Sequence, residues 1–536
     1  MMSGLRARAR FAARRHTSPI PWSNRSASTL VVYSIARSDS NDWEVLGPIA
    51  ICQEVKQRPA VRLREMTMNP LRLPVIAMTL VLLGCVTPPK LDPQLQTIAN
   101  DRLGLSSQGS VPAMRTWWST FNDPQLDRLM EQALADNPNL AQAMARVREA
   151  QSLADVARAG LAPSLSFNAQ EIRQRFSGHD VIPPPYAGTK RWQGHEGLNL
   201  SWDIDFWGRQ DSLLKQAHSR ATAAALDIAS ARLALSGALA RAYIDLCRNE
   251  QLVDVAQRTE AQRERILEIT RRRVRSGLDT NVELREASGA VPEAHVELLQ
   301  ALAAAALDTH QLAALSGQGA VVYTQIVRPT LNPAAILPLP EALPADLLGH
   351  RPDVLAARDR IEAAHAGQAA AKAAFYPDIN MAAFAGTSAV GFDNLFHGSS
   401  GAYGAGAAIH LPLFDAGRLR AEYHGAAAEV DDAVSAYNQS VLEAVRETSD
   451  QLSLIEALNG EIVLQERSLD DAEAAYQLAE ERYHAGLSSY LTVLNAESAV
   501  LSARRERVAL VSGAAIARVS LLLAVGGNFD PGVQHE

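Results

Sequence analysis

The sequence predicts a mainly α-helical fold with a β portion, built from two copies of one unit: a helix, a β-hairpin and a long helical hairpin. Residues 208–277 and 417–486 contain no proline, and each stretch begins and ends with a glycine, so both glycines recur at an offset of 209. Apolar residues within these stretches recur every three or four positions, which is the period of one helix face. A single helix of that length reaches about 100 Å, far more than a compact domain needs.

Composition and charge exclude several classes of function. The 536 residues carry a net charge of -8, and basic residues are concentrated before residue 85, which leaves the remainder more acidic still. Such a chain is a poor candidate for binding nucleic acid. The sequence has no phosphate loop, nucleophile elbow, paired-cysteine motif or His-Glu-x-x-His motif, and its 13 histidines show no recurrent ligand spacing. We therefore expect no enzymatic activity, no metal and no cofactor.

The N-terminal part has the features of a bacterial lipoprotein precursor. Residues 1–65 are Arg-rich and are interpreted as an extension upstream of the true start codon, Met66 or Met68; a cleaved or disordered extension is the alternative. Residues 66–84 form a signal peptide with a basic start and a short apolar run. Cys85 ends a lipobox-like Leu-Leu-Gly-Cys sequence and is the expected lipidation site, with a buried cysteine at the end of a core helix as the alternative. The next residue is not the aspartate associated with inner-membrane retention, so the outer membrane is the expected destination.

The boundaries of the mature chain follow from its prolines, its glycines and its changes of period. They define a lipidated leader over 85–122, a first repeat over 123–317, a linker over 318–350, a second repeat over 351–526 and a tail over 527–536. The first repeat is expected to hold strands at about 163–176 and 195–206 and a helical hairpin at 208–316. The second is expected to hold strands at about 376–390 and 401–414 and a helical hairpin at 417–525. The strand-to-helix landmarks are Gly208, Arg209, Gly417 and Arg418.

The predicted strands alternate apolar and polar residues over about ten positions, as the segment from Leu198 to Phe206 shows best. Their lengths suit tilted transmembrane strands. Four strands cannot close a barrel, and open sheet edges are not tolerated in lipid. If the strands lie in a membrane, several chains must therefore share one barrel; a small soluble sheet with one wet face is the alternative.

Each long arm turns back at a glycine, Gly277 in the first copy and Gly486 in the second. The segment Thr280–Glu283 has the spacing of a capping box for the first return helix. Pro292 is expected to kink that helix. The run Arg271–Arg273, just before the first turn, is interpreted as a solvated helix face, with a role in docking a partner as the alternative.

Three local motifs, taken in this order, carry a resemblance to a known family. They are Trp117-Trp118 with Phe121-Asn122-Asp123-Pro124-Gln125-Leu126, Leu413-Phe414-Asp415-Ala416-Gly417-Arg418, and Arg482-Tyr483-His484-Ala485-Gly486-Leu487. With these motifs and the duplication, residues 115–526 resemble the outer-membrane efflux proteins, the TolC-like channels. The lipobox indicates the lipoprotein branch of that family, which serves RND-type tripartite pumps.

The resemblance implies a homotrimer whose twelve-stranded β-barrel in the outer membrane continues as an α-helical tunnel across the periplasm, with the linker 318–350 in an equatorial layer. The implied function is that of an exit duct, which passively conducts drugs or other small molecules from an inner-membrane RND-type pump and a periplasmic adaptor. The turn residues Gly277, Leu278, Gly486 and Leu487 would face the adaptor. Two alternatives stay open, a channel for type I protein secretion and a periplasmic coiled-coil adaptor or scaffold. The sequence names neither the substrate nor the cognate pump.

In relatives the closed gate follows the second turn, with a bulky aliphatic residue and an aspartate five and nine positions past the glycine. In this sequence those positions hold Leu491 and Asn495, so the leucine matches and the aspartate does not. A ring of carboxylates would repel itself and attract cations, whereas a ring of asparagines would constrict by size and hydrogen bonding only. We expect a gate of Leu491 and Asn495 with Tyr483 bracing the turn; ordinary coiled-coil packing is the alternative. Glu283 and Glu497 lie near enough in sequence to substitute for the missing carboxylate.

Overall fold

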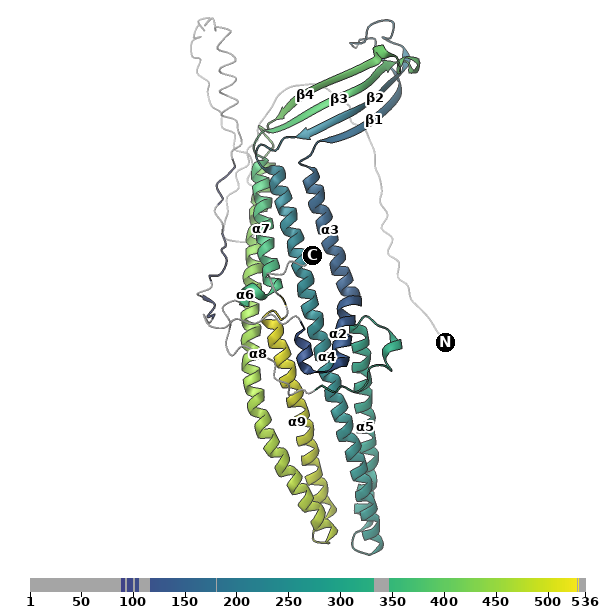
Figure 1. Cartoon of the computed structure of the whole chain (residues 1–536), viewed down its shortest axis with the longest axis vertical. Helices are drawn as coiled ribbons and strands as arrows, with labels where there is room; N and C mark the ends of the chain where they lie inside the picture. The colour runs from purple at the N-terminus through teal and green to yellow at the C-terminus, as the bar shows by residue number, and fades with distance from the viewer. Residues whose placement is uncertain are drawn as a thin grey trace, which may run out of the picture. The chain divides into compact units, whose positions relative to one another are not determined.

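The computed structural model describes residues 88–91, 94–99, 102–105, 116–179, 181–331, 347–527 and 529. The chain divides into two units, residues 1–73 and 74–536, and every described residue belongs to the second. The predicted upstream extension, the signal peptide and the lipidation site Cys85 therefore lie outside the described residues, as do part of the linker and nearly all of the tail. Figure 1 shows the described elements in colour.

The order of the elements repeats itself, as the sequence predicts. The elements are η2 (Trp117–Phe121), α2 (Pro124–Asp136), α3 (Pro138–Ala159), β1 (Ser164–Arg175), β2 (Lys190–Asp203), α4 (Arg209–Arg275), α5 (Asn281–Leu315), η3 (Ala320–Val322), α6 (Leu347–His350), α7 (Pro352–Ala373), β3 (Asp378–Val390), η4 (Phe392–Asn394), η5 (Gly398–Ser400), β4 (Gly401–His410), α8 (Arg418–His484) and α9 (Tyr490–Ala524). The long helices α4 and α8 each have 67 residues, and the return helices α5 and α9 each have 35. The duplicated unit of helix, β-hairpin and long helical hairpin is therefore confirmed.

The four strands form one antiparallel sheet in the order β1-β2-β3-β4. Each repeat supplies one hairpin, and the two hairpins join where β2 pairs with β3, from Asp203 opposite Asn380 to Gln193 opposite Val390. Large apolar side chains on the strands, such as Phe167 and Ile409, are exposed. In the part of the chain that is described, strands β1 and β4 each pair on one side only, so the sheet has two open edges.

Three strand ends differ from the sequence prediction, and one of them is the end of β2, at Asp203 rather than near residue 206. Strand β2 begins at Lys190 rather than near residue 195, because its polar first residues pair with β1 from Arg175 onward although they lack the alternation that marks the rest of the strand. Strand β4 ends at His410 rather than near residue 414. Pro412 follows two residues later and has no N–H to donate to a neighbouring strand.

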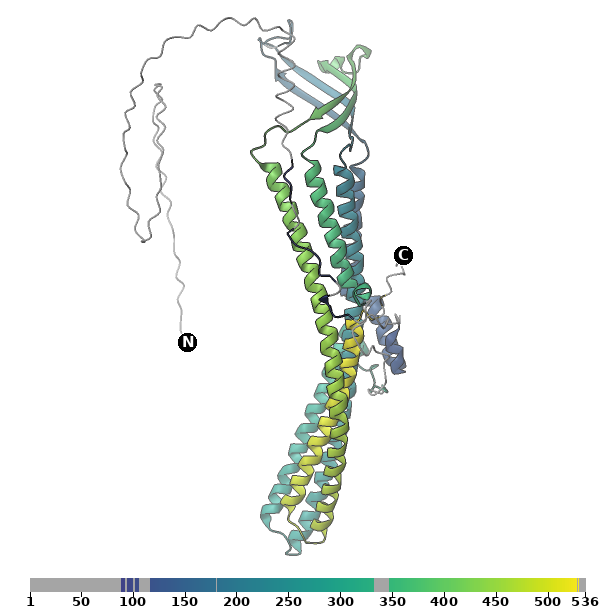
Figure 2. The same ribbon diagram turned by 90° about the vertical axis from the view of Figure 1, so that its left-hand side faces the viewer.

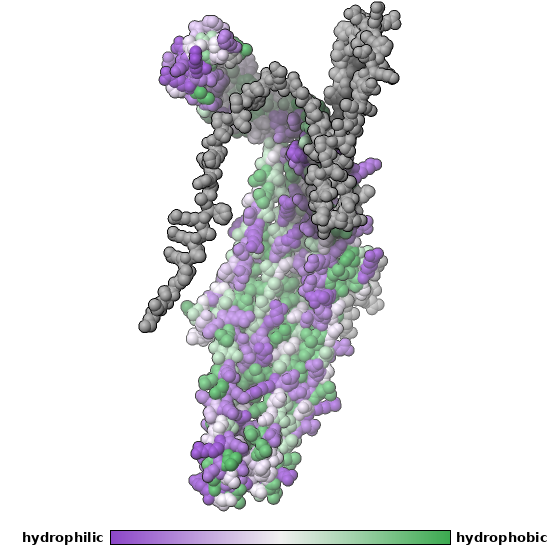
Figure 3. Space-filling view, turned by 180° about the vertical axis from the view of Figure 1, so that it is seen from behind, coloured by the Kyte–Doolittle hydropathy of each residue, from purple (hydrophilic) through white to green (hydrophobic). Residues whose placement is uncertain are grey.

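The helical part has two levels, which share the long helices α4 and α8 (Figures 1 and 2). Next to the sheet, α3 packs on α4, α4 on α7, and α7 on α8. Farther from the sheet, α5 packs on α4, α4 on α9, and α9 on α8. Helices α4 and α9 each contain a stretch that by length and composition alone could cross a membrane, and 39% and 50% of these stretches are buried within the chain. On the face shown in Figure 3, apolar and polar side chains are mixed along the helical body.

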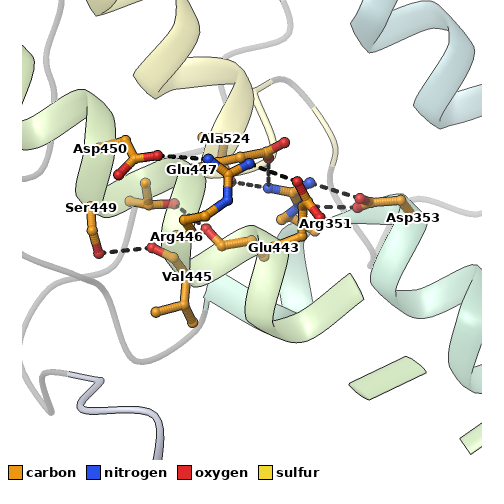
Figure 4. A network of polar contacts seen from close by, with 11 residues as sticks. Arg351, Asp353, Glu443, Val445, Arg446, Glu447, Ser449, Asp450 and Ala524 are labelled. Atoms are coloured by element: carbon orange, nitrogen blue, oxygen red, sulfur yellow. Dashed lines mark hydrogen bonds and ion pairs between the residues drawn. The ribbon is translucent and has the colours of Figure 1, made fainter. Parts of the chain in front are cut away.

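Each return helix ends beside the start of the short helix of its own repeat, α5 beside α3 and α9 beside α7. At the first junction the Asn137 side chain donates a hydrogen bond to the Leu315 carbonyl oxygen at 2.9 Å. At the second junction Arg351 donates to the Ala524 carbonyl oxygen at 3.1 Å and also pairs with Asp353 and Glu447, both at 2.7 Å (Figure 4). The last carbonyl groups of α5 and α9, which have no partner within their own helices, thus find side-chain donors.

A buried core at the level of these junctions explains the first motif of the resemblance. Trp117, Trp118 and Phe121 pack into the largest hydrophobic cluster together with residues of α4. The Asp123 carboxylate caps α2 through the Gln125 N–H at 2.9 Å and accepts the Tyr243 hydroxyl at 2.8 Å and the Thr330 N–H at 2.9 Å. Burial alone would raise the pKa of Asp123, but these hydrogen bonds outweigh it and hold the pKa below its ordinary value. Asp123 therefore fixes the linker, at Thr330, to α2 and α4.

Candidate functional site

The two turns farthest from the sheet end their helices in the same way. Gly277 and Gly486 have φ angles of 73° and 76°, which only glycine adopts without strain. The Leu278 N–H donates to the Arg273 carbonyl at 2.9 Å, and the Leu487 N–H donates to the Arg482 carbonyl at 2.8 Å. These are the six-to-one hydrogen bonds of a Schellman motif. The repeated glycines are therefore explained by the geometry of the turns.

Side chains from both helical hairpins meet just above these turns in a cluster that we call the tip latch: Thr270, Arg273, Asp279 and Tyr483. The Tyr483 side chain is 1% exposed, and its hydroxyl donates to an Asp279 carboxylate oxygen at 2.7 Å and lies 3.0 Å from the Thr270 hydroxyl. Arg273 forms two bonds with the same carboxylate, at 2.8 and 3.1 Å, and donates to the Tyr483 carbonyl at 2.7 Å. Its guanidinium also lies 4.5 Å from the centre of the Tyr483 ring.

The electrostatics of the tip latch are those of a closed ion pair with a neutral phenol. Hydrogen bonds from Arg273 are the main reason why the pKa of Asp279 lies below its ordinary value. Burial raises the pKa of Tyr483 to about 12. At neutral pH the carboxylate is therefore ionised and the phenol keeps its proton, so Tyr483 is a hydrogen-bond donor to a charged acceptor. Such bonds are about twice as strong as neutral ones.

The structure places only one of the three predicted gate residues in the tip latch. Tyr483 is a member, but Leu491 and Asn495 lie on α9 with exposed side chains, and neither contacts the latch through a hydrogen bond in the described chain. Glu283, a predicted substitute for the missing aspartate, forms a capping box with Thr280 at the start of α5. The predicted capping box is thus confirmed.

The three arginines at 271–273 differ in their exposure to solvent. Arg271 and Arg272 are solvent-exposed, as the solvated-face interpretation requires, but the Arg273 side chain is only 11% exposed and pairs with Asp279 in the latch, so that interpretation is wrong for Arg273. The sequence did not mark Arg273, Asp279 and Thr270 as members of one cluster. The signal was an arginine and an aspartate on the two sides of a helix-ending glycine, close enough to pair across the turn.

The other predicted residues lie at the ends of the long helices. Leu278 and Leu487 are 64% and 70% exposed at the two turns. At the opposite ends, Gly208 and Gly417 occupy the N-cap positions of α4 and α8 with positive φ angles. Asp415 accepts the Gly417 N–H at 3.0 Å and so fixes the entry into α8. Arg209 and Arg418 follow as the first residues of these helices. Among the described residues, no group of three His, Cys, Asp or Glu side chains could hold a metal ion.

A comparison with known proteins decides the family. The model of the family described as outer membrane efflux protein matches residues 129–318 and 343–527. The chain belongs to the outer membrane efflux protein family. It is 35% identical over 374 residues to the fusaric acid resistance protein FusA of Burkholderia cepacia, which covers 68% of this chain and 70% of FusA. It is 32% identical to the toluene efflux pump outer membrane protein TtgF of Pseudomonas putida over 77% of this chain and 85% of TtgF.

Solved structures of the family agree in fold. The outer membrane protein VceC of Vibrio cholerae aligns with a TM-score of 0.74 at 33% identity and covers 78% of this chain and 100% of its own. The Campylobacter jejuni outer membrane channel CmeC, at 20% identity, shows the same fold with a TM-score of 0.76. This member of the outer membrane efflux protein family is thus a TolC-like outer-membrane exit duct for efflux. It lies in the outer membrane and extends into the periplasm, and the alternative of a periplasmic adaptor or scaffold is set aside.

Proposed function

We propose that three copies of this chain share one twelve-stranded barrel and form a passive duct for small molecules, which an inner-membrane RND-type pump delivers through a periplasmic adaptor. The observation that carries this proposal is the four-stranded sheet with exposed apolar side chains and two open edges. In lipid such edges must pair, and pairing β1 of one copy with β4 of the next does so without any further element. Three such sheets give the twelve strands that the family resemblance implies.

The mass of the detergent-solubilised protein tests this assembly. Light scattering with the detergent contribution subtracted is expected to give a particle of three chains, of 57.8 kDa each before processing, that precipitates when detergent is removed. A soluble monomer would overturn the shared barrel.

The tip latch supports a proposal for the gate. Tyr483 belongs to α8, whereas Thr270 and Asp279 belong to α4 and the turn after it. Their bonds therefore hold the α8–α9 hairpin against the α4–α5 hairpin, and the duct opens at its periplasmic end when they break. Leu491 and Asn495 lie four residues apart on one face of α9 and form the constriction. If Leu491→Ser changes neither the pore conductance nor the entry of large antibiotics, this constriction is wrongly placed.

The exposed leucines at the turns are proposed to dock the adaptor. Leu278 and Leu487 lie on equivalent turns and expose apolar side chains at the very end of each hairpin, next to Gly277 and Gly486. Single cysteines at these leucines are expected to form cross-links to the adaptor in cells. A cysteine in place of Val321, which is 82% exposed on η3, is the matched control and should form none.

Lipidation at Cys85 and the class of substrate are further parts of the proposal. Labelling of cells with radioactive palmitate should mark the wild type but not Cys85→Ser, while replacement of the buried Cys247 should leave the label unchanged. The substrates are proposed to be small organic molecules, since relatives bear names that refer to fusaric acid resistance, toluene efflux and pyoverdine export. Loss of export of such compounds on deletion, with protein secretion intact, would separate this function from type I secretion.

A further inference from the structure

The contact between α4 and α9 is a coiled-coil seam with one interruption. Buried positions recur on α4 at three- and four-residue spacing, as do those on α9, which is the pattern of core positions in a coiled coil. The buried positions with this spacing are Ala256, Thr259, Arg263, Ile266 and Thr270 on α4, and Tyr490, Val493, Glu497 and Val500 on α9. Arg263 and Glu497 are the two residues of this set with charged side chains. They belong to different hairpins.

This buried pair is poorly satisfied. Arg263 and Glu497 are 9% and 2% exposed, and the Arg263 Nε lies 3.6 Å from a Glu497 carboxylate oxygen, beyond ordinary hydrogen-bond distance. Neither that Nε nor the other carboxylate oxygen, Oε1, has a hydrogen-bond partner among the described residues. Arg263 is held to its own hairpin by the Ala290 carbonyl at 3.0 Å and by Glu293 at 3.6 Å. The ion pair with Arg263 connects Glu497 to the other hairpin.

The surroundings of Glu497 do not compensate for its burial. Helix α5 presents Glu293 and Glu297, α8 presents Tyr476, and α9 presents Tyr490, so Arg263 is the cation that faces this carboxylate. Burial raises the pKa of Glu497 above its ordinary value in spite of Arg263. The electrostatic attraction of the pair therefore offsets only part of the hydration free energy that both ions lose in the closed seam.

A seam with such a pair is easier to part than an apolar one. When two apolar side chains separate, their surfaces return to water, which is unfavourable in proportion to the area exposed. When Arg263 and Glu497 separate, each ion regains its hydration, which offsets the lost attraction. The duplication provides a comparison, since the positions 209 residues away hold Ala472 for Arg263 and Ser288 for Glu497. The charged pair is thus particular to the α4–α9 seam.

We propose that Arg263 and Glu497 form a hydrophilic joint that lowers the free energy of separating α9 from α4, so that the two hairpins can part when the duct opens. This inference rests on the proposed gate, in which the α8–α9 hairpin moves against the α4–α5 hairpin. The joint and the tip latch have opposite effects: the latch stabilises the closed arrangement, and the joint facilitates its opening. Arg263 and Glu497 are positioning residues, because they act through the packing of the helices.

The test replaces the joint by apolar residues of similar length, Arg263→Met with Glu497→Leu, in a chain that also carries Tyr483→Phe. Single-channel recordings in planar lipid bilayers measure the fraction of time that each variant is open. The joint replacement is expected to reduce the open fraction of Tyr483→Phe at least tenfold, while thermal unfolding occurs at the same or a higher temperature. The matched control is Arg504→Met with Glu473→Leu, an ion pair at 2.7 Å that links α8 to α9 within one hairpin and should leave opening unchanged.

Two outcomes would overturn the joint. One is that the joint replacement in the Tyr483→Phe chain leaves the open fraction equal to that of Tyr483→Phe alone, while the protein still unfolds at the expected temperature. The other is unchanged hydrogen exchange of the α9 amides around Glu497, which the replacement is expected to slow at least tenfold because the apolar seam opens less often. If Tyr483→Phe does not open the channel, the proposed latch is refuted, but the joint is still untouched by that result. Hydrogen exchange of the α9 amides then tests the joint by itself. A single Glu497→Leu should lower the unfolding temperature, because it leaves the Arg263 charge buried and unpaired.

Discussion

Removing one oxygen atom from the tip latch should open the duct. Tyr483→Phe keeps the buried ring and its contact with the Arg273 guanidinium but deletes the hydroxyl that donates to Asp279 at 2.7 Å and meets Thr270 at 3.0 Å. Asp279 retains its two bonds from Arg273, so no charge is left unpaired. The substitution therefore removes the hydroxyl contacts between the two hairpins and leaves the bond from Arg273 to the Tyr483 carbonyl oxygen in place.

The size of the effect follows from the kind of bond that is lost. A buried hydrogen bond to a charged group contributes about 1.5–3 kcal/mol. We take about 2 kcal/mol, since the bond from Thr270 is neutral and Thr270 can donate to the Ile266 carbonyl at 3.0 Å instead. If the bond exists only in the closed arrangement, the ratio of open to closed arrangements rises about 30-fold for each chain of the trimer.

Planar-bilayer recordings measure this ratio directly, and the entry of large antibiotics into cells gives an independent reading. The matched control is Tyr476→Phe on the same helix, because the Tyr476 hydroxyl is buried without a hydrogen bond of ordinary geometry, although Gln262 lies near it. Tyr476→Phe should leave the open fraction unchanged. An equal open fraction in Tyr483→Phe and the wild type, in protein that remains trimeric, would refute the latch.

Three further predictions concern the linker, a helix junction and the constriction. Asp123→Asn should lower the unfolding free energy by about 2 kcal/mol at neutral pH. Because the pKa of Asp123 is depressed in the folded protein, its stabilising contribution is present above the ordinary pKa of 3.8 and is lost as the pH falls through the folded pKa. The melting temperatures of wild type and variant should therefore converge when thermal unfolding is measured in acid. Gly526→Ala should lower the free energy of unfolding by more than about 3 kcal/mol, since its Cβ would lie 2.1 Å from the His350 carbonyl oxygen. Gly277→Ala, whose Cβ would have no atom within 4 Å, should lower it by about 1 kcal/mol through backbone strain. Equal melting temperatures of the two variants would contradict this. Asn495→Asp should place three carboxylates at the constriction of a trimer and make conductance sensitive to divalent cations, which the wild type should not be.

The fold could be predicted from the sequence because its signals are long and repeated. Two proline-free stretches of matching length leave little room for anything but paired long helices. Period-two alternation from Leu198 onward identifies a strand without any tertiary information, although β2 ends at Asp203, before the alternation does. The same signal failed at Lys190, where strand pairing with β1 rather than alternation decides the conformation. Local pattern thus predicts an element well when its own side chains determine it, and poorly when a neighbour does.

The candidate site was only partly predictable for a related physical reason. Tyr483 could be found because it belongs to a motif next to a helix-ending glycine. Its partner Asp279 is 204 residues away, and no local pattern in either segment predicts that the two side chains are in contact. Arg273 was assigned to solvent because it stands in a run of three arginines, and only the turn at Gly277 brings it to Asp279 rather than to water. The contact between Tyr483 and Asp279 forms only when the two hairpins pack and is not encoded in the spacing of either one, whereas the Arg273–Asp279 pair lies within one hairpin and its spacing was visible in the sequence.

The position of the hydrophilic joint relative to the tip latch bears on how a long helical tunnel can open at all. Arg263 and Thr270 are seven residues apart on α4, which is about 10 Å along the helix axis. The two sets of side chains share no hydrogen-bond or ion-pair partner, although Tyr490 packs beside Tyr483 and lies near Glu497, so they are coupled by packing rather than by a common polar group. The latch can therefore hold the closed tip through a few strong bonds, while the free energy needed to separate α9 from α4 in the seam above it remains small. A seam that was apolar throughout would add its whole buried area to the barrier, and breaking the latch alone would then not suffice to part the hairpins.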